Sequence, residues 1–287
     1  MSMVDVHVHV FPRVSKWYPR EVSELAPAER EAPVEQLLDT MEGAGVSKAV
    51  LIQLGGYGEN HRYLADCLKR FPERFAGVGL VDPASPDPAE ELTELVKATA
   101  VRGVRLNRLG KPGTGRVTEL PSYPLWKRCA ELGVAICIYA HADQAGFLEP
   151  LIREFQNVRV AFDHLGVCPT NFSVDRLRRP RIETELPPPT MQTILALAKY
   201  RNVYVKLSGD YAFSHLPYPY PDMRPVYRLL YEAYGAERLM WGTDFPWILE
   251  EPGYKQLTKL IDFHLPDLKR REREAILGET ASRFWHL

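Results

Sequence analysis

The sequence has no apolar run that could cross a membrane, because none reaches the roughly 18 residues that a membrane-spanning helix needs. It also has no excess of one charge, since 36 Lys and Arg residues face 37 Asp and Glu residues, for a formal net charge of −1. Such a balance disfavours a nucleic-acid partner. The first residues, MSMVDVHVHVFP, lack the basic segment and the hydrophobic segment of a signal peptide. We therefore expect a cytoplasmic protein with no nucleic-acid or membrane partner.

Cysteine is scarce, with four residues in 287, and no two of them form a CxxC pair. The sequence thus predicts neither a disulfide framework nor a cysteine metal site. No GxGxxG segment follows any apolar run, which removes the usual sign of a dinucleotide-binding sheet. What is present is ordinary for a globular protein, with 45% apolar and 25% charged residues. This composition excludes a disordered chain.

Short apolar segments alternate along the chain with amphipathic helical segments. The expected strands cover residues 4–11, 48–55, 75–82, 101–109, 134–141, 158–166, 203–209 and 239–247. The expected helices cover residues 34–44, 60–71, 89–100, 123–132, 145–156, 191–200 and 223–234, with two more at 254–263 and 269–277. This order predicts parallel strands joined by right-handed crossovers. We expect an α/β fold, a (β/α)8 TIM barrel formed by residues 1–287 as a single domain, with an open doubly wound sheet as the alternative.

Three connections are long and proline-rich, namely residues 12–33, 168–189 and 215–225. Each follows an expected strand rather than a helix. In a barrel, the loops that follow the strands form the C-terminal face, where active sites lie. Long loops in compact domains are often functional lids. We therefore interpret all three as parts of the mouth of a site.

The first expected strand carries two histidines and an aspartate at alternate positions. Because successive strand residues point to opposite faces, Asp5, His7 and His9 are expected to face the barrel axis, with the valines between them facing the helices. Two imidazoles at positions i and i+2 lie about 7 Å apart, close enough to share one cation.

Further imidazoles and a carboxylate end other expected strands. His141 ends the fifth, His164 ends the sixth and Asp244 lies near the end of the eighth. Strand ends of a barrel meet at one face, and buried polar groups need partners. We therefore expect these three residues to converge with His7 and His9 on one site.

Sequence segments spread over nearly the whole chain resemble one enzyme family. They are VDVHVHVF, LIQLGGYGENHRYLADCLKRFPERFAGVGLVDP, VRGVRLN, DHLG, VKLSG, RLMWGTDFPW and AILGETASRFW. In this order they resemble the amidohydrolase-related (β/α)8 metal-dependent hydrolases. That family includes sugar lactonases, 2-pyrone-4,6-dicarboxylate lactonase and aminocarboxymuconate-semialdehyde decarboxylase. VRGVRLN, DHLG and KLSG are most similar to the lactonase branch.

The resemblance implies a site for one divalent metal, expected to be zinc, with His7, His9, His141 and Asp244 around the ion. It also implies catalytic roles for Asp244, which would take the proton of a water molecule, and for His164, which would steady an oxyanion or act as an acid. Neutral imidazoles and a carboxylate suit zinc. A mechanism without metal stays open, in which the same side chains hold the substrate and activate water.

Further polar residues are expected to contact the substrate. The candidates are Gln53, Arg105, Asn107, Lys206, Ser208 and Tyr211. Arg105 and Asn107 occupy the strand on which two-metal relatives carry a bridging Lys or Glu, so a second metal is not expected. An arginine can hold a carboxylate with two parallel hydrogen bonds. The set therefore predicts a small anionic substrate.

These observations lead to one main hypothesis and one alternative. The main hypothesis is a hydrolase that opens a small carboxylated or sugar-acid lactone with activated water. The alternative is a metal-dependent non-oxidative decarboxylase of an aromatic or muconate-type acid, built on the same site. The sequence leaves open the identity of the substrate and whether the chain forms a homo-oligomer.

Overall fold

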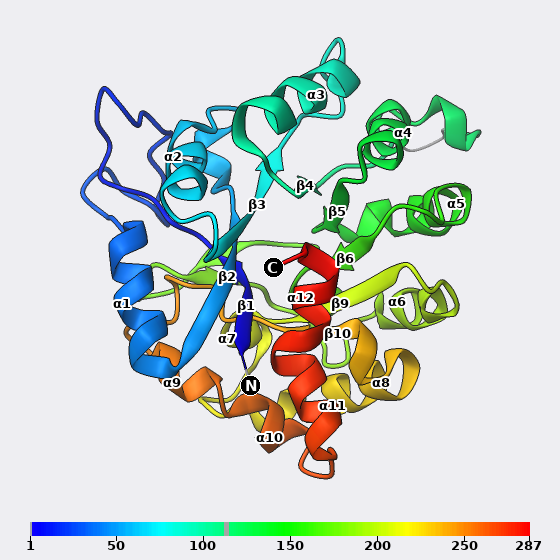
Figure 1. Ribbon diagram of the computed structural model, residues 1–287. Coiled ribbons are helices and arrows are strands. Elements are labelled where there is room, and N and C mark those ends of the chain that lie inside the picture. The colour runs from blue at the N-terminus through cyan, green and yellow to red at the C-terminus, as the bar shows by residue number, and fades with distance from the viewer. Residues whose placement is uncertain (1, 112–114) are drawn as a thin grey trace.

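The protein forms a ring of parallel strands surrounded by helices, as the computed structural model of residues 2–111 and 115–287 shows (Figure 1). The sheet has the order β1-β2-β3-β4-β5-β6-β9-β10, and every pairing is parallel. The bounds are β1 Met3–Val8, β2 Val46–Ile52, β3 Phe75–Leu80, β4 Gly103–Leu106, β5 Ala135–Ile138, β6 Val160–Phe162, β9 Val203–Leu207 and β10 Leu239–Trp241. The expected strands and the barrel are confirmed.

Helices lie between successive strands on the outside of the ring. They are α1 Val34–Ala44, α2 Arg62–Arg70, α3 Pro88–Thr99, α4 Tyr123–Leu132, α5 Leu148–Glu154, α6 Met191–Ala196 and α8 Arg224–Tyr234. The last part of the chain differs from the prediction, because 254–263 divides into α9 Tyr254–Leu257 and α10 Leu260–His264. It then continues through α11 Arg270–Glu274 and a π-helical turn, Ala275–Glu279, into α12 Thr280–Trp285. Among the described residues, no helix has the length and apolarity needed to span a bilayer.

The ring closes between β1 and the segment that follows β10. The amide of Asp244 donates to the carbonyl of His7 at 2.9 Å, and the amide of His9 donates to the carbonyl of Phe245 at 2.7 Å. Val8 and Phe245 form a parallel bridge at the same point. Closure therefore uses the backbone of the residues that the sequence singled out as functional.

The lower interior of the barrel is apolar and is filled partly by the last helix. Buried side chains from β1, β2, β3, β5, β6 and β10 form one cluster with Trp285 of α12. A Cβ atom on Gly103 would lie 2.8 Å from the Trp285 ring, so the absence of a side chain there makes room for the indole. In Figure 1, α12 and the C-terminus lie across the centre of the ring. This packing leaves polar side chains to the opposite, C-terminal face.

The expected alternation along β1 is wrong for its first half. Val4 and Val6 belong to the interior cluster with Trp285, whereas the Asp5 carboxylate accepts hydrogen bonds from the Thr243 hydroxyl at 2.5 Å and from the Tyr254 hydroxyl of α9 at 2.8 Å. The pairing of β1 with β2 shifts register between Asp5 and Val8. Such an irregularity re-aims side chains, which is why Asp5 turns away from the axis while His7 faces it.

The loop at 168–189 contains a small antiparallel hairpin, β7 Ser173–Val174 with β8 Pro180–Arg181. It is bonded to neighbouring loops, because Arg179 Nη1 donates to the Glu251 carbonyl at 2.7 Å and Arg181 Nη1 donates to the Tyr211 carbonyl at 3.3 Å. The hairpin therefore lies over the C-terminal face of the barrel.

Replacing Asp5 by alanine should destabilise the fold, because Asp5 also accepts hydrogen bonds from the amides of Thr243 and His7. Leaving these buried donors unsatisfied should lower the free energy of unfolding by about 2–4 kcal/mol. Chemical denaturation at fixed pH measures the change. Asp39→Ala, at an exposed aspartate, is the control and should stay within about 0.5 kcal/mol of wild type. An Asp5→Ala protein as stable as this control would show that the contacts do not stabilise the closure.

Candidate active site

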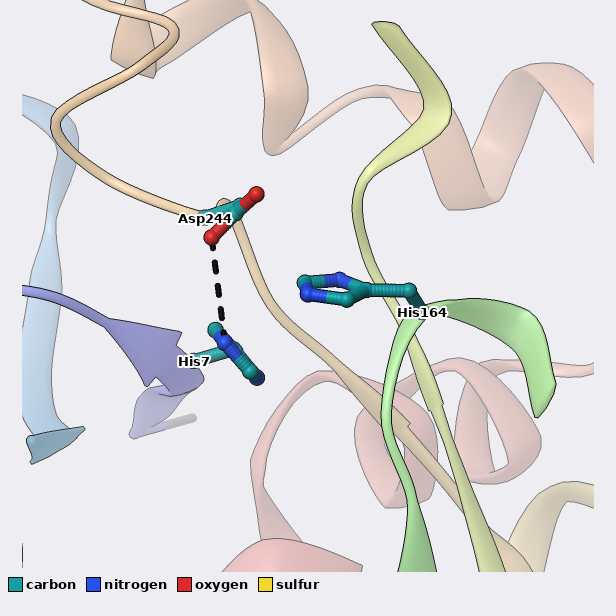
Figure 2. A group of neighbouring side chains, drawn as sticks. All are labelled: His7, His164 and Asp244. Carbon is teal, nitrogen blue, oxygen red and sulfur yellow. Dashed lines mark ion pairs between the residues drawn. The ribbon is translucent and has the colours of Figure 1, made fainter. Parts of the chain in front are cut away.

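The site is built around a compact group of three buried side chains. Donor atoms of His7, His164 and Asp244 all lie within 4.8 Å of one another. Figure 2 shows that they come from three separate segments and point toward one another. His7 Nε2 lies 3.7 Å from Asp244 Oδ1, and the His7 and His164 ring centroids are 4.3 Å apart. Residues far apart in sequence thus meet where the strands end.

The local backbone determines how these side chains are presented. Asp244 follows β10 with φ 63°, and His164 follows β6 with φ 49°. Non-glycine residues rarely adopt positive φ, and such positions occur often at functional sites. The hydrogen bond from the Asp244 amide to the His7 carbonyl supports one of these conformations. The turn after each strand therefore directs its functional side chain into the mouth.

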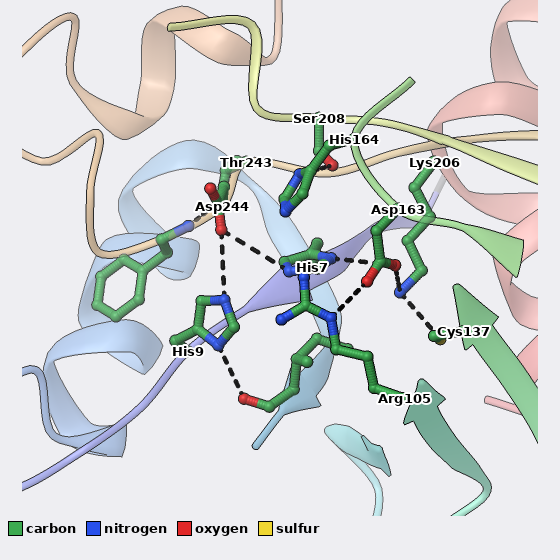
Figure 3. Close-up of polar contacts among 12 residues, drawn as sticks. His7, His9, Arg105, Cys137, Asp163, His164, Lys206, Ser208, Thr243 and Asp244 are labelled. Atoms are coloured by element: carbon green, nitrogen blue, oxygen red, sulfur yellow. Dashed lines mark hydrogen bonds and ion pairs between the residues drawn. The ribbon is translucent and has the colours of Figure 1, made fainter. Parts of the chain in front are cut away.

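Below this group, Asp163 binds three cationic or polar side chains. Its carboxylate lies 2.8 Å from Lys206 Nζ, 2.7 Å from Arg105 Nε and 3.5 Å from His7 Nδ1 (Figure 3). Lys206 also lies 3.2 Å from the Cys137 sulfur. A buried charge is tolerated only when it is paired. Asp163 therefore neutralises the fully buried Lys206, fixes the orientation of Arg105 and lies close to the His7 ring.

The environment sets the charge state of each acid in this network. Burial alone would raise the pKa of Asp163, but Lys206, His7 and Arg105 outweigh it and hold the pKa well below its ordinary value. Burial would likewise raise the pKa of Asp244, and His164, His9 and His7 lower it. Both carboxyls are therefore ionised at neutral pH.

Burial has the opposite effect on the histidines, because it lowers their pKa. Burial lowers the pKa of His164 to about 4, although Asp244 and Asp163 act to raise it. Burial also lowers the pKa of His7 well below its ordinary value, despite the nearby Asp163. Both rings are therefore neutral at neutral pH. Neutral imidazoles can ligate a metal or hydrogen-bond through either nitrogen.

Two residues of the β9 end hold the catalytic candidates in place. The Ser208 hydroxyl lies 3.0 Å from His164 Nδ1, and the Tyr211 hydroxyl donates to Asp244 Oδ2 at 2.6 Å. Ser208 and Tyr211 were expected to contact the substrate directly. In the structure their hydroxyls contact His164 and Asp244, and a direct contact with the substrate stays a prediction.

A cavity of about 160 Å³ opens beside the group. Its polar lining comes from His9, Arg105, Tyr139, His164 and Asp244, and its apolar lining includes Leu25, Leu54, Phe172, Phe213 and Trp247. His9 Nε2 lies 3.4 Å from Asp244 Oδ1, while Nδ1 lies 2.9 Å from the Ile52 carbonyl. Leu25 and Phe172 belong to two of the three long loops, at 12–33 and 168–189. These loops therefore form part of the mouth.

The structure does not bring His141 into the three-residue group. β5 ends at Ile138, and His141 directly precedes a 3-10 turn, Ala142–Phe147, so strand alternation no longer directs it inward. Its Nδ1 lies 3.2 Å from the Pro169 carbonyl, and the side chain lines a different cavity of about 540 Å³. Tyr139, two residues earlier, lines the site cavity instead.

Three other predicted substrate contacts are also placed away from the cavity wall. Asn107 is exposed. The Gln53 side-chain amide donates to the carbonyls of Gly58 and Asn60, at 3.2 and 3.0 Å, and so fixes a loop. Lys206 is fully buried against Asp163. Of the six predicted substrate contacts, Arg105 is the one that lines this cavity within the described part of the chain.

Sequence reasoning missed Asp163 and Tyr139. The signal for Asp163 was present, because two cationic side chains, Arg105 and Lys206, were both expected in the site, and buried cations need a carboxylate partner. Tyr139 shares a strand face with Cys137, two positions before it. Its ring lies 4.7 Å from the Arg105 guanidinium and 5.2 Å from the His164 ring.

The donor set fits one divalent cation. Within residues 2–111 and 115–287, His7 Nε2 and Asp244 Oδ1 are buried and find no hydrogen-bond partner. His9 Nε2 approaches the same carboxylate oxygen. Buried imidazole nitrogens beside a carboxylate oxygen are ligands that zinc prefers.

Known proteins similar to this chain over most of its length include hydrolases and a lactonase. A 4-sulfomuconolactone hydrolase of Rhizobium radiobacter is 27% identical over 84% of this chain and 75% of its own length. An L-fucono-1,5-lactonase of Burkholderia ambifaria is 24% identical over 85% of this chain and 80% of its own length. A crystal structure from Pseudomonas putida, proposed to be a 2-pyrone-4,6-dicarboxylic acid hydrolase, superposes with a TM-score of 0.77 at 26% identity and covers 99% of this chain and 97% of its own.

The family model described as amidohydrolase matches residues 4–287, nearly the whole chain. This match covers every barrel strand except the first residue of β1. The expected family resemblance is thus confirmed, and the chain is an enzyme that belongs to the amidohydrolase family.

Proposed function

We propose that the enzyme opens a small anionic lactone by hydrolysis, with Asp244 as the base that activates water. The observation that carries this proposal is the buried, ionised Asp244 carboxylate at the cavity wall, bonded to Tyr211 and adjacent to His164. Relatives named as lactone hydrolases support the substrate class. The chemistry and the comparisons therefore favour the same reaction.

In this mechanism, Asp244 accepts a proton from a water molecule as the water oxygen attacks the acyl carbon of the lactone. The bond between the acyl carbon and the ring oxygen then breaks, and the proton passes to the departing ring oxygen, which gives a hydroxy acid. Tyr211 uses its hydroxyl to hold Oδ2 of Asp244, which fixes the orientation of the carboxylate. General-base catalysis of this kind contributes typically about 10²–10⁴-fold.

His164 is suited to stabilising the developing oxyanion. We assign the neutral ring the tautomer in which the Ser208 hydroxyl, 3.0 Å from Nδ1, donates to that nitrogen; the ring proton is then on Nε2 and can donate to the acyl oxygen. The low pKa of His164, about 4 because of burial, disfavours the alternative role of a protonated acid at neutral pH.

Arg105 is the proposed contact for an acidic group of the substrate. It lines the cavity and uses Nε to bind Asp163, and the guanidinium has further N–H groups for a carboxylate. The pairing with Asp163 fixes the plane of the guanidinium before substrate binds. This arrangement favours carboxylated lactones over neutral ones.

We propose His7, His9 and Asp244 as the residues that hold a divalent cation, because both Nε2 atoms approach Asp244 Oδ1. When bound, such a cation polarises a carbonyl group and acidifies a nearby water molecule. His164 stays available for the acyl oxygen, and His141 is not needed.

The decarboxylase alternative would use the same residues but a different product. Decarboxylation releases CO2 and consumes no water, whereas lactone opening consumes water and releases no gas. Product analysis on each substrate class therefore separates the two reactions.

Asp244→Asn should lose activity with little change in fold, because the amide keeps the size of the side chain but not its basicity. We expect kcat to fall by at least about 100-fold on any lactone that the wild type opens. Steady-state assays on a panel of carboxylated and sugar-acid lactones measure this. Asp39→Asn, at an exposed position, serves as the control, and equal rates for Asp244→Asn and wild type would exclude the proposed base.

Arg105→Ala should discriminate between substrates. The loss of a charge-assisted hydrogen bond of about 1.5–3 kcal/mol should raise KM for a carboxylated lactone roughly 10–100-fold. For a neutral lactone of similar size the KM should change much less. The same increase for both lactones would indicate that Arg105 supports the site structure instead of binding the acidic group.

Elemental analysis tests the metal ligands without an activity assay. Protein purified without added metal should carry zinc or another divalent ion, and His9→Ala should lower the metal content several-fold. His141→Ala is the matched control and should retain wild-type content. Loss of metal in His141→Ala would return that residue to the ligand set, and full activity of metal-free protein would favour the mechanism without metal.

A further inference from the structure

The turn that follows β9 connects the site to the outer helices. It starts at Gly209, with φ 82°, and continues into α7, Asp210–Phe213. A Cβ atom at Gly209 would lie 2.8 Å from His164 Nδ1, so the turn packs directly against that ring. The next-but-one residue, Tyr211, bonds Asp244. The position of this single turn therefore determines contacts to both proposed catalytic residues.

Asp210 is buried in the same turn but bonds residues outside the site. Its Oδ2 accepts a hydrogen bond from the Tyr227 hydroxyl of α8 at 3.2 Å, and its Oδ1 lies 3.9 Å from His264 Nε2 of α10. The rings of Tyr227 and His264 stack with centroids 4.2 Å apart. Asp210 thus bonds the turn to α8 and lies close to α10 without a hydrogen bond to it.

Burying the Asp210 carboxyl group lowers the stability of the folded protein. Asp210, Tyr227 and His264 are 4%, 1% and 0% exposed, and burial raises the pKa of the Asp210 carboxyl to about 6. Burying a carboxyl group is unfavourable, and apolar packing would hold two helices together as well. A directional hydrogen bond, however, fixes the rotation of a short turn in a way that apolar contacts do not.

We propose that Asp210 is a positioning residue for catalysis: through its hydrogen bond with Tyr227 it fixes the turn at 209–213, and so holds the Tyr211 hydroxyl on Asp244. This inference rests on the proposed role of Asp244. The Asp210 side chain bonds α8, and it is not part of the cavity lining among the described residues. Its effect on the reaction is therefore indirect, and Tyr211 is the residue of the turn that bonds Asp244.

Single variants give the first test. Asp210→Ala should lower kcat about tenfold with KM nearly unchanged, as expected for loss of one hydrogen bond to a charged group. Tyr227→Phe removes the same bond from the other side and should give a similar loss. Asp210→Asn keeps an acceptor oxygen and should restore most of the rate. Tyr231→Phe is the control, because Tyr231 lies on the same helix but bonds Glu272, and it should retain the wild-type rate.

A double variant separates positioning from general destabilisation. If Asp210 acts through Tyr211, Asp210→Ala in a Tyr211→Phe background should cause almost no further loss of kcat. Losses that multiply in the double variant would overturn the proposal. So would wild-type kcat in both Asp210→Ala and Tyr227→Phe, or an equal loss in Tyr231→Phe.

Hydrogen exchange measured by mass spectrometry provides a readout that does not need a substrate. Amides of residues 209–214 should exchange faster in Asp210→Ala and Tyr227→Phe than in wild type, while the amides of β9 stay protected. Unchanged exchange in this segment would contradict the proposal even if no lactone is found. If wild type opens no lactone but the exchange changes as expected, the proposed function fails and the role of Asp210 in fixing the turn stands.

Discussion

Two buried carboxylates, Asp163 and Asp244, share one imidazole, and the rest of the site depends on keeping both of them charged. His7 lies between them, 3.5 Å from Asp163 and 3.7 Å from Asp244. Asp163 is neutralised by Lys206 and Arg105, so that it serves structure. Asp244 has histidines and a tyrosine around it instead of lysine and arginine partners, so that its charge stays available for chemistry. The same residue type thus has two functions because its neighbours differ.

The residues that close the barrel are also residues of the site. The hydrogen bonds that close the ring use the backbones of His7, His9 and Asp244, and the buried Asp5 carboxylate secures the residue before Asp244. The site is therefore held by the same hydrogen bonds that close the barrel. The polar groups lie at one end because α12 fills the other with apolar side chains. The outer helix α8 contributes through Asp210, which links it to the turn that carries Tyr211.

The strand and helix order was predictable because alternation of short apolar runs and amphipathic segments is a strong periodic signal. The directions in which individual side chains point were harder to predict from the sequence. Strand alternation failed at Asp5, where a register shift in β1 intervenes, and at His141, which lies beyond the end of its strand. Asp163 was missed although it directly precedes His164, because its importance follows from the cations around it. Convergence of His7, His164 and Asp244 followed from topology alone, since parallel strand ends meet at one face.

The central claim is that water, activated at Asp244, opens a lactone, and the fate of the water oxygen tests it most directly. A lactone that the enzyme consumes is incubated with wild-type protein in ¹⁸O-labelled water for a single turnover. The mass of the product is then measured by mass spectrometry. The account predicts a hydroxy acid with one ¹⁸O atom in its new carboxyl group and no release of CO2. A product that contains no ¹⁸O and has lost CO2 would contradict it.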